Sequence, residues 1–183
     1  MANHQQLDHG ETFTHGGYEF RVTFEPDSDI REPWKEYDGH GKVSDWTSRD
    51  KAPGERVLCT DRMGRAGTSK RFYDVRASVE IARRDRWGCS NASHAHATTG
   101  ETAACAVDRD FEYLRAFCAG DWEYLVVGVT LLDDDGEPTS ETEYLGAVES
   151  IDRQYLADTA HELADQIISR IEVADPDVQV SNN

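Results

Sequence analysis

The segment 122–132, with the sequence Trp-Glu-Tyr-Leu-Val-Val-Gly-Val-Thr-Leu-Leu, constrains the fold more than any other part of the chain. Its run of aromatic and β-branched residues predicts a largely buried strand. The turn-forming residues 133–136, Asp-Asp-Asp-Gly, follow directly and predict a hairpin whose second strand lies at about 143–149. We therefore expect an antiparallel sheet to be built on this hairpin.

Two further strands are indicated by pattern. Residues 17–25 alternate apolar and polar side chains, as a half-buried strand does. We expect this strand to pair beside the 122–149 hairpin. Residues 56–60 form a short possible strand within a longer stretch that is rich in turn residues.

The remaining apolar segments are predicted to be helices. Asp74 can cap a helix that ends near residue 85. Thr98 and Glu101 have the spacing of a capping box, and Gly120 is placed to end the helix that they begin. Apolar residues at steps of three and four predict a last helix over 152–171.

This order of elements predicts an α+β fold, in which about three helices pack mainly on one face of an antiparallel sheet of about three to four strands. A length of 183 residues fits one domain, which we place at 17–173. Residues 1–16 are expected to be a flexible arm, and 174–183 a flexible acidic tail. The stretch 26–71 is expected to be a long ordered loop, and a loop of that length usually has a function.

The net charge of −17 is unevenly distributed along the chain. Residues 51–100 carry 5 acids and 10 bases, whereas residues 101–183 carry 20 acids and 4 bases. Such segregation could give two surfaces of opposite sign, or the basic middle could pair with the acidic half. The excess of Arg over Lys, 15 against 4, is typical of GC-rich or salt-adapted genomes.

The four cysteines show no C-x-x-C spacing, and the N-terminus has no secretion signal, so we expect no disulfides. Cys105 and Cys118 lie in a helical pattern and are interpreted as small buried hydrophobes. A zinc site at Cys89, His94, His96 and Cys105 would match no common finger spacing. We predict no bound metal and no cofactor. No apolar run is long enough for a membrane span, which favours the cytoplasm.

The segment 32–46, called the Trp loop below, is the first candidate site. Trp34 and Trp46 bracket a Gly-His-Gly tip, and such large apolar side chains are expected to be pinned to the body of the protein. Histidine side chains in general exchange a proton near neutral pH, and Asp38 could orient the ring of His40 for metal binding or general base catalysis. A structural turn with a hydrogen-bonded histidine is the alternative.

Two charged segments are the other candidates. Arg49, Arg83 and Arg84 belong to the basic segment 49–86, which could bind nucleic acid, although a pI of about 4.6 opposes nonspecific binding to DNA. Asp133, Asp134 and Asp135 stand among many other carboxylates, which could mimic nucleic acid towards a partner or could simply be solvated.

Several short motifs together resemble a family of small proteins encoded by tailed phages and prophages. The resemblance covers about residues 17–165 and rests on the following pieces: Pro33-Trp34, Asp38-Gly39-His40-Gly41 with Val43-Ser44 and Trp46, Pro53-Gly54-Glu55-Arg56, Phe72-Tyr73-Asp74, Ile81-Ala82-Arg83-Arg84-Asp85 with Trp87-Gly88, and 146–149. At position 86 it leads us to expect Gly, whereas this chain has Arg86, so the helix end is expected to be built differently. The resemblance implies a mobile-element setting inside bacteria, and no activity.

Three hypotheses for the function follow. The first is a non-enzymatic phage accessory protein in the host cytoplasm that binds a host or phage protein, as an anti-defence inhibitor could, through the acidic surface and the Trp loop. The second is a nucleic-acid-binding module that uses the segment 49–86. The third is a hydrolytic or metal-dependent enzyme centred on His40, which is disfavoured because the chain offers no nucleophile with an obvious base.

Overall fold

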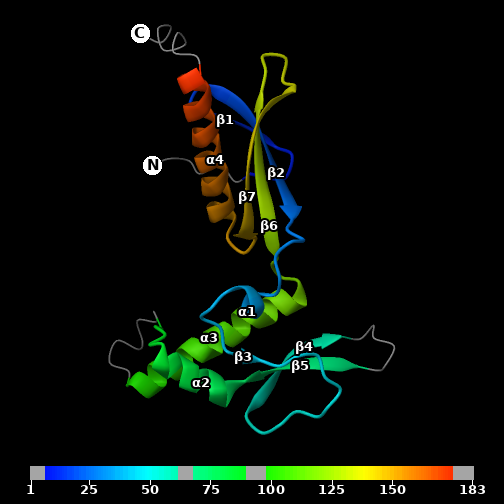
Figure 1. The fold of residues 1–183 in the computed structure, drawn as a ribbon, viewed down its shortest axis with the longest axis vertical. Coiled ribbons are helices and arrows are strands. Elements are labelled where there is room, and N and C mark those ends of the chain that lie inside the picture. Colours follow the sequence, from blue (N-terminus) through cyan, green and yellow to red (C-terminus); the bar gives the residue numbers. More distant parts are fainter. Residues whose placement is uncertain (1–6, 62–67, 90–97, 175–183) are drawn as a thin grey trace. The chain divides into compact units, whose positions relative to one another are not determined.

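The computed structural model describes residues 7–61, 68–89 and 98–174 (Figure 1). The chain forms two compact units: unit 1 comprises residues 1–30 and 122–183, and unit 2 comprises residues 31–121. The predicted α+β class is confirmed, but the strands form two antiparallel sheets rather than one. Each unit has a separate hydrophobic core, which is why the range 17–173, expected to be one domain, divides in two.

Unit 1 is a four-stranded antiparallel sheet with one long helix on one face (Figure 1). The strand order is β1-β2-β6-β7. The elements are β1 (Thr12–His15), β2 (Tyr18–Pro26), β6 (Tyr124–Leu132), β7 (Pro138–Glu149) and α4 (Arg153–Ala174).

Side chains that point to one face of the sheet, at alternate positions along the strands, form the core of unit 1. Val22 of β2 is fully buried and lies opposite Val129 of β6, which is fully buried too. The fully buried Ile167 of α4 belongs to the same core. The predicted pairing of the strand at 17–25 with the 122–149 hairpin is therefore confirmed.

Strand β1 departs from the flexible arm expected over residues 1–16, of which the structure describes residues 7–16. Phe13 is buried, lies opposite Phe20 of β2 and stacks on it with ring centroids 5.7 Å apart. A four-residue strand with one inward-facing apolar side chain has too little periodicity to be detected in the sequence.

A bulge shapes the end of β7. Ala147 has a positive φ of 60°, and its N–H donates to Asp27 Oδ2 at 2.8 Å. A Cβ on the neighbouring Gly146 would lie 2.8 Å from the same oxygen, so only glycine leaves room for this carboxylate. Asp27 thus holds the irregular backbone of the edge strand in place.

In its described residues, unit 2 combines three helices with a three-stranded antiparallel sheet of order β3-β5-β4. Its elements are α1 (Pro33–Glu36), β3 (Lys42–Val43), β4 (Glu55–Asp61), β5 (Ser69–Asp74), α2 (Val75–Arg84) and α3 (Thr99–Ala119). The expected loop at 26–71 therefore contains one short helix and two whole strands. Residues 62–67 of this stretch lie outside the described residues.

The predicted helix caps are confirmed. The Asp74 carboxylate accepts from Ala77 N at 3.0 Å, and Thr98 and Glu101 form the capping box. Gly120 ends α3 with a φ of 79°. Helix α2 ends in a Schellman arrangement, in which Trp87 N donates to Ala82 O at 2.9 Å.

Arg86 occupies the left-handed position of that arrangement, with a φ of 56°. Glycine adopts this conformation without steric cost, whereas an arginine does not. The helix therefore keeps the backbone that a glycine would favour at this position, although the residue is arginine.

The expectation of no disulfides is wrong. Cys59 of β4 is bonded to Cys118 of α3, with Cα atoms 5.5 Å apart, and Cys89 is bonded to Cys105 of α3. Each bond joins residues that are distant in sequence, 59 and 16 positions apart, so local spacing did not indicate it. The bonded Cys89 and Cys105 oppose the zinc alternative, whose two histidines lie outside the described residues.

Candidate functional site

The tip of the Trp loop is held by one carboxylate, Asp110 of α3, whose side chain is only 9% exposed. Its Oδ1 lies 2.7 Å from Nδ1 of His40. Its Oδ2 accepts from Gly41 N at 2.8 Å and from the Tyr73 hydroxyl at 2.7 Å. The carboxylate beside His40 is therefore Asp110, and not Asp38 as the sequence suggested.

Close packing around Gly41 fixes the path of the loop. A Cβ at this position would collide with the hydroxyl oxygens of Tyr73 and Ser78. Ser78 Oγ also accepts from Lys42 N at 2.9 Å and donates to Asp74 O at 2.6 Å. The loop backbone is thus tied to both α2 and α3.

Tyr73 is a permanent donor in this cluster. Burial raises the pKa of its hydroxyl far above the ordinary value of 10, and the neighbouring Asp110 carboxylate adds to the increase. The hydroxyl therefore keeps its proton at any physiological pH and donates it to Asp110.

His40 has one ring nitrogen committed to this cluster and one remaining. Its ring stacks on Tyr113 with centroids 5.7 Å apart and an interplanar angle of 10°. The bond to Asp110 assigns the proton to Nδ1, which leaves Nε2 as the acceptor. An Asp–His pair in this tautomer can act as a general base.

A pocket of about 410 Å³ adjoins His40. Four of its lining residues are candidates from the sequence: Trp34, Asp38, His40 and Arg84. The rest of the lining is Tyr37, Gly39, Ile81 and Asp85. This described lining has no serine, cysteine or lysine, so a base at His40 would act on water or directly on a bound molecule.

Arg84 and Asp85 carry charge at the rim of this pocket. Two hydrogen bonds of 2.7 Å join the guanidinium to the carboxylate. The hydrogen bonds from Arg84 hold the pKa of Asp85 below its usual range. Both side chains are exposed, so the pair can exchange its partners for a bound ligand at small cost.

Both tryptophans of the Trp loop pack on one buried cation. Arg71 of β5 lies 5.2 Å from the ring centroid of Trp34 and 4.8 Å from that of Trp46. Its side chain is 5% exposed, and its Nη2 donates to Glu32 Oε1 at 2.6 Å. The buried Nε and Nη1 find no hydrogen-bond acceptor among the described residues, so the indole faces are their main favourable surroundings.

Glu32 supplies the negative charge for this arrangement. Burial raises the pKa of its carboxyl, but hydrogen bonds from its own backbone and from Lys35, together with the charge of Arg71, outweigh that effect. The pKa of Glu32 therefore lies below its ordinary value of 4.5. The carboxylate stays ionised beside Arg71 at neutral pH.

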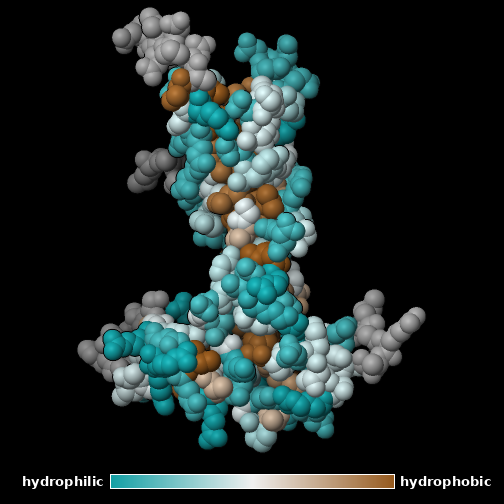
Figure 2. Space-filling view, viewed as in Figure 1, coloured by the Kyte–Doolittle hydropathy of each residue, from teal (hydrophilic) through white to brown (hydrophobic). Residues whose placement is uncertain are grey.

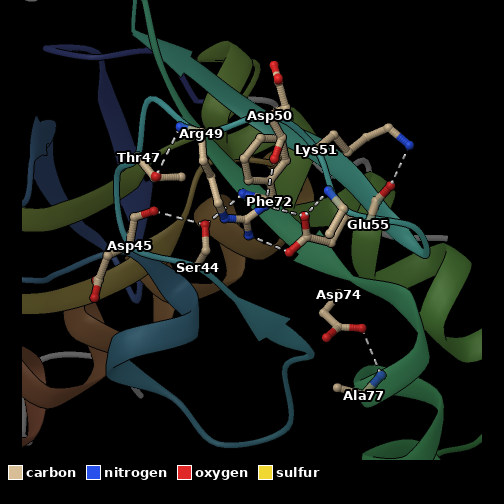
Figure 3. A network of polar contacts seen from close by, with 11 residues as sticks. Ser44, Asp45, Thr47, Arg49, Asp50, Lys51, Glu55, Phe72, Asp74 and Ala77 are labelled. Atoms are coloured by element: carbon tan, nitrogen blue, oxygen red, sulfur yellow. Dashed lines mark hydrogen bonds and ion pairs between the residues drawn. The ribbon is translucent and has the colours of Figure 1, made fainter. Parts of the chain in front are cut away.

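Arg49 is engaged in a separate network, shown in Figure 3. Its guanidinium lies 4.6 Å from the centroid of Phe72 and donates to Glu55 Oε2 at 2.7 Å. The Glu55 carboxylate also accepts from Ala52 N at 2.8 Å. Arg49 thus stabilises the approach to β4 and does not lie in the pocket lining at His40.

The remaining candidates lie elsewhere. Arg83 is exposed on α2 and lies near Gly100, where a Cβ would come within 3.2 Å of its Nη2. Asp133, Asp134 and Asp135 are exposed in the turn between β6 and β7 of unit 1, and Figure 2 shows that this hairpin tip is hydrophilic. Asp133 Oδ1 accepts from the backbone N–H of Asp135 and of Glu137, so it shapes the turn.

The charge of the chain divides between the two units. Unit 1 contains 21 acidic and 3 basic residues, whereas unit 2 contains 15 acidic and 16 basic residues. Several arginines of unit 2 pair with acids of the same unit, as Arg56 does with Asp108 at 2.7 Å. The basic middle is therefore balanced largely by nearby carboxylates, and unit 1 keeps a large negative charge.

Comparison with protein-family models, with curated proteins and with solved structures finds no match to this chain. Within the described parts of the chain, no helix combines the length and the apolar character that crossing a bilayer requires.

Proposed function

We propose that the protein is a phage or prophage accessory protein that acts by binding a host or phage protein. The observation that carries this proposal is the rigid presentation of aromatic side chains by the Trp loop. Tyr37 is 44% exposed and Trp46 is 47% exposed, although the backbone between them is tied to Asp110 and Ser78.

A preordered loop of this kind is suited to recognition. Little conformational entropy is lost on binding when the contact side chains are already in place. Tyr and Trp are also the residue types that most often dominate the binding energy of interfaces. Packing of Trp46 on Arg71 leaves the rest of its indole surface for a partner.

The charge of unit 1 indicates the chemistry of the partner. A unit with 21 acids and 3 bases attracts basic surfaces and repels nucleic acid. A host defence protein with a phosphate-binding groove would present such a basic surface. The resemblance to phage and prophage proteins supports this setting.

A nucleic-acid-binding role for the segment 49–86 is less well supported. Arg49, Arg71 and Arg84 are each engaged by a carboxylate of unit 2. Titration of DNA and RNA at low and moderate salt tests this role. Binding at low salt that weakens steeply as salt is added would favour it over the main proposal.

The experiment for the main proposal is affinity capture from host lysate with three proteins. These are the wild type, Trp46→Ala, and Tyr155→Ala, which removes an aromatic side chain of similar exposure from α4 of unit 1. We expect the wild type and Tyr155→Ala to recover the same specific proteins and Trp46→Ala to lose them. Trp46→Phe, which keeps a ring beside Arg71, separates loss of contact surface from loss of loop order.

Equal recovery by all of these variants would show that the Trp loop is not the interface. Circular dichroism and thermal unfolding of each variant establish that it is folded before capture.

The Asp110–His40 pair supports a second candidate function, general base catalysis in the adjoining pocket. His40→Gln keeps a hydrogen-bonding side chain but removes the titratable ring. If a panel of hydrolase substrates gives a turnover that this substitution abolishes while Asp108→Asn leaves it intact, the protein is an enzyme. If the wild type turns over none of them, the panel gives this candidate no support.

A further inference from the structure

We infer that His15 and His161 of unit 1 form a binding site for a divalent transition metal ion, with Zn²⁺ as the simplest case. This site is independent of the Trp loop and of the proposed function. It departs from the expectation of no bound metal.

The two imidazoles meet across unit 1, between β1 and α4. Nδ1 of His15 lies 3.2 Å from Nδ1 of His161, and the ring centroids are 4.9 Å apart. Two nitrogen ligands on one tetrahedral zinc ion, each about 2.0–2.1 Å from the metal, lie about 3.3 Å apart. The observed separation therefore already fits a shared ion.

Metal-binding histidines commonly donate a hydrogen bond from their other ring nitrogen to a carboxylate, and Asp165 provides that carboxylate for His15. Its Oδ1 lies 2.7 Å from Nε2 of His15. This hydrogen bond assigns the proton of His15 to Nε2, so Nδ1 carries the lone pair that a metal needs. The carboxylate also makes the ring a stronger donor.

The second ring is held in place as well. His161 packs edge-on against Phe13, with centroids 5.1 Å apart and an interplanar angle of 85°. The side chain of His15 is 27% exposed, so water can reach the pair and complete the coordination of an ion. Two oriented imidazoles, one with a carboxylate behind it, form a small donor set that suits zinc, nickel or copper.

The described residues contain no group of three or more His, Cys, Asp and Glu side chains arranged to hold a metal. The proposed ion would therefore have two protein ligands, with water in the other positions. The excess of 21 acids over 3 bases in unit 1 favours its approach. Without metal, Nδ1–H of His161 can donate to Nδ1 of His15; when an ion binds, the neutral ring carries its proton on Nε2 instead and presents Nδ1 to the metal.

Isothermal titration of ZnCl₂ into the full chain at pH 7.5 tests the inference. We expect one ion per chain for the wild type, and loss of that binding in His15→Gln and in His161→Gln. Asp165→Asn should weaken binding about tenfold or more, as is usual when the carboxylate behind a histidine is removed. His9→Gln, a change at an exposed histidine of the same unit, should leave the affinity unchanged.

A second measurement does not depend on any variant. Long-range ¹H–¹⁵N NMR spectra of the imidazoles should show Zn²⁺ shifting Nδ1 of both His15 and His161. The inference is overturned if the wild type binds no Zn²⁺, if both glutamine variants bind it as the wild type does, or if saturating Zn²⁺ leaves both Nδ1 signals unmoved. Unweakened binding by Asp165→Asn would remove Asp165 from the site.

Discussion

Asp110 accepts hydrogen bonds from Tyr73, Gly41 and His40, which precede it by 37, 69 and 70 residues. No local pattern could join these positions. The available signal was that Asp110 lies on the apolar face of a helix, three residues after the buried Val107 and four before the buried Leu114. A charged residue at such a position needs buried partners, so it indicates a structured polar site before the partners are known.

Asp110→Asn should destabilise unit 2. The amide keeps one acceptor oxygen but cannot accept from all three donors, so at least one buried donor loses its partner. We expect a loss of about 2–3 kcal/mol in the free energy of unfolding measured in urea. Asp108→Asn, on the same helix but in an exposed ion pair with Arg56, should cost less than about 1 kcal/mol. Equal losses for the two variants would contradict the central role of Asp110.

Glu55 gives a prediction about pH. Hydrogen bonding to Arg49 lowers the pKa of Glu55 below its ordinary value of 4.5, so the ionised form stabilises the folded state. That contribution is fully present above pH 4.5 and is lost as the pH falls through the lower pKa of the folded state.

We therefore expect Glu55→Gln to reduce the fall in melting temperature that the wild type shows on acidification below pH 4.5. Glu80→Gln, at an exposed position of α2, should not reduce it. The measurement is thermal unfolding followed by circular dichroism between pH 6 and pH 3. An unchanged acid dependence in Glu55→Gln would remove this ion pair as a cause.

At the scale of elements, prediction from the sequence succeeded where the signal is local. Caps at Asp74, Thr98 and Gly120 lie within a few residues of the groups that they satisfy, so a single sequence specifies them. The two disulfides join residues that are distant in the chain, and they were missed for that reason. Strand β1 pairs with the neighbouring β2 and was missed because it is too short to show a period. The half-buried Cys105 and Cys118 are bonded, although helical spacing alone suggested unbonded core residues.

Arg86→Gly should stabilise the end of α2. The residue has a φ of 56° after the helix, a conformation that costs a non-glycine residue about 1–2 kcal/mol, part of which is offset by the greater freedom of an unfolded glycine. We expect a net gain of about 0.5–1 kcal/mol in unfolding free energy. Arg83→Gly, inside the helix, should instead cost about 1 kcal/mol. A loss in both variants would show that the arginine side chain at position 86 outweighs its backbone strain.

The Cys59–Cys118 bond closes the larger loop of unit 2. Because cross-linking restricts the unfolded chain more when the loop is longer, its removal should cost about 4 kcal/mol, against about 3 kcal/mol for the Cys89–Cys105 bond. Unfolding of Cys59→Ala/Cys118→Ala and of Cys89→Ala/Cys105→Ala, each compared with the oxidised wild type, measures both. A thiol titration that finds four free cysteines in the native protein would contradict both bonds.

At the scale of the whole molecule, the sequence showed the uneven charge but not the division into units. The basic segment 49–86 falls wholly within unit 2, so the change in composition did follow the architecture. The boundaries near residues 30 and 122 carry no linker signal, and unit 1 is assembled from two separated stretches of chain. Tertiary contacts bring these two stretches together, so the order of residues along the chain does not show that they belong to one unit.

The charge of unit 1 leads to a prediction about salt. With 21 acids and 3 bases, its folded state is destabilised by repulsion between carboxylates, and salt screens that repulsion over about 10 Å at 0.1 M ionic strength and over less at higher salt. The melting temperature of the protein should therefore rise between 0.05 M and 2 M KCl. The double substitution Asp134→Lys/Asp135→Lys should raise the melting temperature at low salt and flatten this dependence.

The matched control changes the same charge in unit 2, at the exposed Asp45 and Asp50. Unit 2 is nearly neutral, so Asp45→Lys/Asp50→Lys has little repulsion to relieve and should leave the salt dependence of unfolding close to that of the wild type. If both double variants flatten it equally, the effect follows the net charge of the chain rather than the charge of unit 1. If the wild type shows no rise with KCl, its acidic residues are too well separated to destabilise the fold. In that case a basic partner would gain its attraction to these carboxylates but would relieve no repulsion among them.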